Sequence, residues 1–258
     1  MLIDAHCHLD FPDFDADREA VFERARAAGV DHFVVPGTTR ARWPGVLALG
    51  ERADVSVCLG LHPYFMDEHR DEDVAALAQA LDAHPEAVTP RIVAIGECGI
   101  DARFADTWDA QWVLFDAQLK LAKARRLPVV IHCVRANDAV AKRLRQLELP
   151  AGGLVHAFAG SPEQAHKFLD LGYVLGLGGA VTHARAQRLH RAVASLPDDG
   201  YVLESDSPDM PPAGHRGERN EPARIGEVCR AVAALRGQTP DQVAAYGAAT
   251  AQRLFGLA

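Results

Sequence analysis

The chain has few cysteines and no long apolar run. Its five cysteines are odd in number and widely spaced, which argues against a disulfide framework and favours a reducing compartment, so we expect a cytoplasmic protein. No run of about 18 apolar residues, the length that a membrane-spanning helix needs, is present. The N-terminal segment Met1-Leu2-Ile3-Asp4 has no basic region before its first acid, and we therefore expect no signal peptide.

Basic residues are fewer than acidic ones. The 258 residues carry 27 Lys and Arg against 35 Asp and Glu, a formal net charge of -8. Proteins that grip long duplex nucleic acid usually carry a basic stripe, and none is visible, so we expect any nucleic-acid contact to be confined to a pocket. With 48% hydrophobic and 24% charged residues, the composition is that of a globular protein, and nothing in it implies a protein partner.

Short apolar runs alternate with amphipathic segments along the chain. The apolar runs are rich in β-branched residues and predict buried strands at 2–8, 32–37, 55–60, 91–97, 128–133, 153–158, 173–178 and 201–206. The segments between them predict helices at 15–28, 40–52, 71–83, 108–126, 135–147, 162–170, 184–195 and 222–236. Eight such units predict an α/β fold, a TIM (β/α)8 barrel, that occupies residues 1–258 as a single domain.

Two pairs of a hydroxyl residue and a proline mark helix starts. Ser161 precedes Pro162, and Thr239 precedes Pro240; in each pair the first residue is a typical cap and the proline suits the first helical position. The second pair predicts an extra C-terminal helix that ends near Phe255. The longest irregular stretch, 207–221, follows the last predicted strand and is a natural place for substrate contacts.

Histidine is unusually frequent, with 12 residues, and several lie at the carboxyl ends of predicted strands, where barrel enzymes build active sites. The histidines and acids at these ends are His6, His8, Glu97, His132, His156 and Asp206. Because side chains alternate along a strand, His6 and His8 share one face while Cys7 points to the other. The same alternation turns Cys98 and Cys133 away, so we do not expect cysteine ligands.

These six side chains are more than one metal ion needs, since a catalytic zinc takes about three protein ligands. Four imidazoles and two carboxylates suit two divalent metal ions, Zn, Mn or Mg, that share a bridging carboxylate. Glu97 lies between the two groups of histidines along the chain, and we predict it as the bridge. Two divalent ions, the carboxylates of Glu97 and Asp206 and a bridging hydroxide together carry one net positive charge. With one ion, the same groups carry one net negative charge, which would repel an anionic substrate.

Seven short motifs run from one end of the chain to the other. They are Asp4-Ala5-His6-Cys7-His8-Leu9, Gly60-Leu61-His62-Pro63, Gly96-Glu97-Cys98-Gly99-Ile100-Asp101, Pro128-Val129-Val130-Ile131-His132 with Arg135, His156-Ala157-Phe158-Ala159-Gly160, Glu204-Ser205-Asp206-Ser207-Pro208, and Arg219-Asn220-Glu221-Pro222. These motifs and their order resemble those of the TatD-type metal-dependent hydrolases, a deoxyribonuclease family of the amidohydrolase superfamily. Ala102 and Asp209 stand where family members often carry an aromatic residue and a tyrosine.

The resemblance implies a metal-dependent phosphodiesterase of the deoxyribonuclease type, acting on DNA ends, short single strands or a small phosphoester held in its pocket. In our mechanistic hypothesis the metal ligands form two sets around Glu97: His6, His8 and Asp206 for one ion, and His132 and His156 for the other. A metal-bridging hydroxide attacks phosphorus, with Glu97 and Asp206 as catalytic residues. The predicted substrate contacts are His62, Arg135, Asn220 and Arg219, and the predicted supports of the ligands are Glu204 and Asp101.

Two other functions are compatible with the same residues. A hydrolase of the same fold would cut a lactone, an amide or another small ester, because a metal-activated water attacks carbon as well as phosphorus. A non-catalytic metal-holding scaffold would be expected to have lost a ligand or the general base, and all six are present. We therefore favour the phosphodiesterase and keep the small-ester hydrolase as the alternative.

Overall fold

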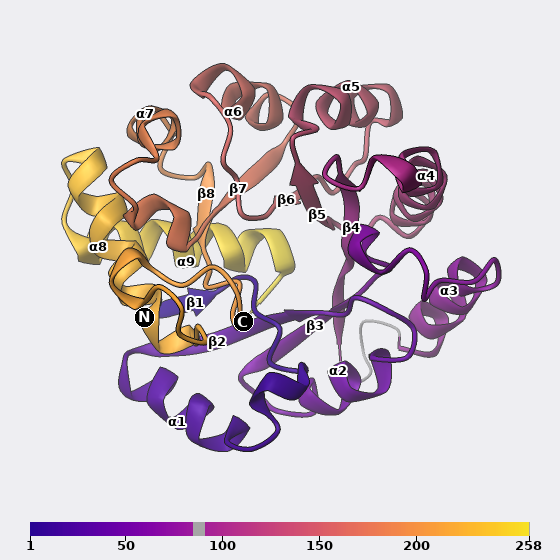
Figure 1. The fold of residues 1–258 in the computed structure, drawn as a ribbon, viewed down its shortest axis with the longest axis horizontal. Helices are drawn as coiled ribbons and strands as arrows, with labels where there is room; N and C mark the ends of the chain where they lie inside the picture. The colour runs from indigo at the N-terminus through magenta and orange to yellow at the C-terminus, as the bar shows by residue number, and fades with distance from the viewer. Residues whose placement is uncertain (85–90, 258) are drawn as a thin grey trace.

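A computed structural model describes residues 1–84 and 91–257. Eight parallel strands lie side by side in chain order and form the wall of a TIM barrel, as predicted, with helices around the outside (Figure 1). The strands are β1 Leu2–Asp4, β2 Val30–Pro36, β3 Val55–Leu59, β4 Ile92–Asp101, β5 Val129–Val134, β6 Gly153–Val155, β7 Tyr173–Leu177 and β8 Tyr201–Leu203. The ring closes between its ends through the N–H of Ala5, which donates to the carbonyl of Leu203 at 3.0 Å.

The helices follow the predicted alternation. They are α1 Arg18–Ala27, α2 Trp43–Leu49, α3 Asp73–Ala83, α4 Trp108–Arg125, α5 Asn137–Leu147, α6 Pro162–Leu169, α7 Gln187–Ala194, α8 Ile225–Arg236 and α9 Pro240–Phe255. Both predicted starts are confirmed, because Ser161 and Thr239 form capping boxes with Gln164 and Gln242. Within the described ranges, no helix is long and apolar enough to cross a membrane.

Several predicted boundaries are wrong by a few residues. The predicted strands 2–8, 153–158 and 201–206 end early, at Asp4, Val155 and Leu203, because the chain leaves the strand ladder before it reaches the site residues. The predicted strand 91–97 instead continues to Asp101, with an irregular register between Ile95 and Cys98. Glu97 therefore lies within β4 and not at its end, and an irregularity of this kind is a common way to re-aim a side chain.

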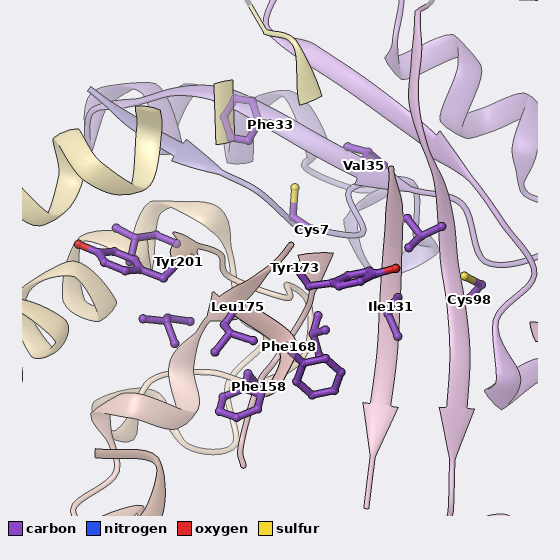
Figure 2. Close-up of a cluster of buried hydrophobic side chains, with 14 of the residues drawn as sticks. Cys7, Phe33, Val35, Cys98, Ile131, Phe158, Phe168, Tyr173, Leu175 and Tyr201 are labelled. Carbon is purple, nitrogen blue, oxygen red and sulfur yellow. The ribbon is translucent and has the colours of Figure 1, made fainter. Parts of the chain in front are cut away.

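Two apolar clusters stabilise the barrel. One lies inside the ring, where strand residues such as Val34 and Val130 pack against Ala248 and Phe255 of α9, so that the C-terminal helix, which crosses the ring in Figure 1, covers one end of it. The other lies between the strands and the outer helices, and Figure 2 shows Cys7 among the side chains of this layer. The predicted outward direction of Cys7 is thus confirmed.

Candidate metal centre

The six predicted metal ligands come together at the carboxyl ends of the strands, around the buried carboxylate of Glu97. One of its oxygens, Oε2, lies 3.2 Å from His6 Nε2 and 3.3 Å from His8 Nε2. Both histidines belong to the segment that follows β1, and their Nε2 atoms are 3.2 Å apart. This side of Glu97 therefore faces the first predicted set of ligands.

The other oxygen of Glu97 faces the second set. Oε1 lies 3.0 Å from His132 Nδ1 and 2.7 Å from His156 Nε2. His132 projects from β5, and His156 directly follows β6. The two carboxylate oxygens of Glu97 thus point to two separate pairs of imidazoles, which is the arrangement expected of a carboxylate that bridges two ions.

Asp206 completes the ring of ligands from the segment after β8. Its Oδ1 lies 3.5 Å from His6 Nε2, 3.7 Å from His8 Nε2 and 3.9 Å from His156 Nδ1. Its backbone N–H donates to the carbonyl of His6 at 2.9 Å, which fixes the two segments to each other. The side chain of Asp206 is 13% exposed, so it borders the opening of the site while Glu97 lies at its floor.

The donor set fits divalent metal ions. Tetrahedral donors at 2.0–2.1 Å from an ion lie about 3.4 Å from one another, and the atoms around Glu97 Oε2 have spacings of this size. This oxygen is also buried without a hydrogen-bond partner within the described part of the chain, which is costly unless a cation compensates it. Sets of three ligand atoms within 4.8 Å of one another are His6, His8 and Glu97; His6, His156 and Asp206; and His62, Glu97 and His132.

The metal-free site carries its charge on histidines. Burial raises the pKa of Glu97, but the neighbouring histidines outweigh it and hold the pKa well below the usual range. Burial lowers the pKa values of His8 and His156, yet Glu97 and Asp206 outweigh it and raise them to about 9 and about 10. Imidazolium groups therefore take the place of the metal charge when no ion is bound.

His62 lies closer to the centre than predicted. Sequence analysis assigns it to substrate binding, whereas the structure buries it and places its Nε2 atom 2.9 Å from Glu97 Oε1. The N–H of Tyr64 donates to His62 Nδ1 at 2.9 Å, so Nδ1 is the unprotonated nitrogen and Nε2 carries the proton. Burial lowers the pKa of His62 to about 4. A neutral His62 therefore donates a hydrogen bond to the bridging carboxylate.

Both predicted supporting acids contact a ligand histidine or its neighbour. Asp101 Oδ2 lies 3.1 Å from His132 Nε2, which directs the other ring nitrogen at Glu97. Glu204 Oε1 accepts a hydrogen bond from the N–H of Ala157 at 2.5 Å and lies 3.9 Å from His156 Nδ1. Gly176 makes room for it, since a Cβ atom there would lie 2.2 Å from Glu204 Oε2.

The other predicted substrate contacts do not join the cluster. Arg135 lines a hollow of about 600 Å³ beside the site, together with Trp108 and Arg188. Arg219 instead pairs with Asp17 and lies over the ring of Phe14.

Asn220, the last of these predicted contacts, is buried. Its Nδ2 atom donates to the carbonyls of Ser205 and Asp209 at 2.8 and 2.9 Å. Asn220 and Arg219 thus hold the loop after β8 in place, and their contact with substrate stays a prediction.

Sequence analysis missed a buried clamp beneath the site. Asp4 Oδ1 accepts hydrogen bonds from the N–H of His6 at 3.3 Å and the N–H of Ser205 at 2.9 Å, and Oδ2 accepts from Ser205 Oγ at 2.6 Å. One carboxylate therefore connects the segments that carry His6 and Asp206. The only signal in the sequence was the position of Asp4 at the start of the first motif.

A model of the family described as TatD related DNase matches residues 3–256. The chain belongs to this family. It is 41% identical over 245 residues to YjjV of Escherichia coli strain K12, an uncharacterized metal-dependent hydrolase, covering 94% of this chain and 93% of YjjV. It is 33% identical over 267 residues to the 3'-5' ssDNA/RNA exonuclease TatD of Erwinia amylovora, covering 99% and 100% of the two chains.

Solved structures agree with this membership. The crystal structure of YjjV, a TatD homologue from Escherichia coli, aligns with a TM-score of 0.94 and 39% identity over 100% of this chain and 98% of that one. An organophosphorus hydrolase variant from Deinococcus radiodurans aligns with a TM-score of 0.67 at 18% identity, over 99% and 93% of the two chains, which shows a common barrel fold only. This TatD family chain is therefore a metal-dependent hydrolase.

Proposed function

We propose that the chain is a metal-dependent phosphodiesterase that removes nucleotides from the ends of single-stranded DNA. The observation that carries the proposal is the position of Glu97, whose two oxygens face separate pairs of histidines at 2.7–3.3 Å. A pair of ions held in this way suits the in-line displacement at a phosphodiester. Relatives in the TatD family that are 33–34% identical over nearly the whole chain are named 3'-5' ssDNA/RNA exonucleases, which supports the substrate class.

In this proposal each ligand set has its own task. His6, His8 and Asp206 would hold one ion, and His132 and His156 would hold the other, with Glu97 as the carboxylate shared between them. When bound, the two ions supply Lewis acidity, which lowers the pKa of a water molecule and neutralises charge on the phosphoryl oxygens. Zn, Mn and Mg all accept imidazole and carboxylate donors to different degrees.

Asp206 is the proton carrier in this proposal. It is the carboxylate at the opening of the site, and its Oδ1 faces His6 and His8. We assign the transferred proton to Oδ2, which takes it from the attacking water and gives it to the leaving oxygen. Burial raises the pKa of Asp206 above the ordinary range, which makes the carboxylate a better proton acceptor near neutral pH.

The acidic balance of the chain fits a substrate that enters end first. A net charge of -8 disfavours a long duplex lying across the surface, whereas one phosphate at a cationic centre needs only local charge. An amide or lactone carries no negative charge for such a centre to neutralise, which is why the phosphodiester is preferred over the small-ester alternative.

The test is cleavage of a labelled single-stranded oligonucleotide by the purified protein with Mg²⁺, Mn²⁺ or Zn²⁺. We expect stepwise shortening that requires metal and is lost in His132→Ala. The matched control is His166→Ala, which removes an exposed histidine from the surface of α6 and is expected to leave cleavage unchanged. A panel of lactones and amides is assayed beside the oligonucleotide, and a higher kcat/KM for any of these would replace the proposal with the alternative function.

A further inference from the structure

Two large aromatic side chains are exposed next to the metal centre. Exposed large hydrophobic residues are few over the described part of the chain, and among them Tyr64 and Phe104 are 56% and 36% exposed. Their ring centroids lie 5.2 Å apart in an edge-to-face arrangement at 90°. They come from loops after two different strands, β3 and β4, so their meeting at the surface is a product of the fold and not of sequence proximity.

The backbone that carries each ring is connected to the metal site by short hydrogen-bonded links. Tyr64 donates its N–H to His62, which in turn donates to Glu97. On the other side, the N–H of Phe104 donates to the carbonyl of Asp101 at 3.2 Å, and the carboxylate of Asp101 contacts His132. The backbone from which each aromatic side chain projects is therefore tied to a neighbour of the metal ligands.

A cation accompanies the two rings. The guanidinium carbon of Arg103 lies 5.7 Å from the ring centroid of Phe104, and the group is ion-paired with Asp101, to which Nε and Nη2 donate at 2.9 and 2.5 Å. The Arg103 side chain is 51% exposed. An open aromatic surface with a cation beside it has the chemistry that binds a nucleobase and the phosphate attached to it.

We propose that Tyr64 and Phe104 form a stacking platform for the base of a nucleotide next to the scissile phosphate, with Arg103 beside its phosphate. This inference rests on the proposed function and deepens it, because it names single-stranded nucleic acid as the occupant and gives it a contact outside the metal site. Stacking tolerates any base, since every base presents a flat face. The platform therefore predicts preference for unpaired strands without sequence specificity.

The first test measures binding with no cleavage step. A single-stranded phosphorothioate oligonucleotide that carries 2-aminopurine is titrated with metal-loaded protein, and stacking is read from quenching of its fluorescence. We expect Tyr64→Ala and Phe104→Ala to weaken binding about 5- to 100-fold and to abolish quenching. Tyr64→Phe keeps the ring and is expected to behave as the unaltered protein, and so is Val113→Ala, which shortens a more exposed apolar side chain on α4.

The second test separates a platform from an effect on the centre. Hydrolysis of methyl p-nitrophenyl phosphate, which has no nucleobase, is expected to stay within about twofold in Tyr64→Ala, while KM for the oligonucleotide rises with little change in kcat. Unchanged binding and quenching in both alanine variants, or an equal loss on the two substrates, would overturn the platform.

The two proposals fail in distinguishable ways. Quenching that depends on Tyr64, without cleavage of DNA, supports the platform and overturns the nuclease. Cleavage with unaltered affinity in both alanine variants overturns the platform alone.

Discussion

His62 donates a hydrogen bond from Nε2 to Oε1 of Glu97 across 2.9 Å, because its other nitrogen accepts one from the backbone N–H of Tyr64. The proton on Nε2 faces the carboxylate, so the neutral ring acts as a donor to the bridge in this arrangement. A histidine in this position orients Glu97 and takes up one lone pair of an oxygen that also faces His132 and His156.

This relationship predicts the kinetics of His62→Ala. Loss of the donor leaves Glu97 less well oriented, and we expect metal affinity to fall about 10- to 100-fold, as for other groups that support a metal ligand. With saturating metal, kcat should fall while KM changes little. His62→Gln retains an N–H donor and should recover part of the loss. A rise in KM alone, with normal metal affinity, would instead make His62 a substrate contact.

Metal uptake is predicted to release protons. Without metal, the pKa values of His8 and His156 are raised to about 9 and about 10, so both rings are protonated at pH 7 and must lose a proton to bind an ion. Affinity should therefore increase with pH up to about 10, by about tenfold per pH unit for each proton released, and less steeply above about 9, where His8 has already lost its proton. Isothermal titration calorimetry in buffers of different ionisation enthalpy counts these protons. A count of zero at pH 7 would contradict this prediction.

The clamp formed by Asp4 predicts a linked loss of stability and metal binding. Asp4→Ala leaves the buried N–H groups of Ser205 and His6 without their acceptor, at a cost of about 1–3 kcal/mol for each orphaned group, whereas the Ser205 hydroxyl still faces Ser207 Oγ at 3.0 Å. Asp4→Asn keeps an acceptor oxygen and should lose less. Urea unfolding of the metal-free variants measures the first effect, and metal content per chain measures the second. An Asp4→Ala protein with unaltered stability would show that the clamp is not structural.

Replacement of two glycines by alanine is predicted to change the free energy of unfolding in opposite directions. At Gly176 a Cβ atom would collide with the buried carboxylate of Glu204, and we expect Gly176→Ala to lower the free energy of unfolding by about 1–3 kcal/mol. At Gly45, within α2, no atom lies within 4 Å of the added Cβ, so Gly45→Ala should raise stability by about 0.5–1 kcal/mol. Thermal and urea unfolding compare the two, and equal effects would refute the packing argument at Gly176.

The barrel and the meeting of its ligands were predictable because both follow from periodicity. Alternating apolar runs and helices predict the ring, and parallel strands bring their carboxyl ends to one mouth, which gathers His6, His132 and Asp206. Boundaries were less predictable. Residues such as Asp206, with a φ of 55°, lie beyond the strand ladder, which ends at Leu203 in β8.

Contacts that depend on ring closure or on irregular backbone were not predictable. Asp4 and Ser205 are 201 residues apart and meet only because the first strand packs against the last. The protonated nitrogen of His62 is set by a backbone amide, which no side-chain pattern reveals. The same holds for Tyr64 and Phe104, whose rings meet only after two loops have folded.

In the proposed metal centre, Glu97 lies between two divalent ions. Crystals grown with Mn²⁺, with data collected at an energy where manganese scatters anomalously, test it most directly. We predict two anomalous peaks per chain, one bounded by His6, His8 and Asp206 and the other by His132 and His156, and the loss of at least one of them in Glu97→Gln. A single peak, or peaks away from Glu97, would rule out a pair of ions bridged by Glu97.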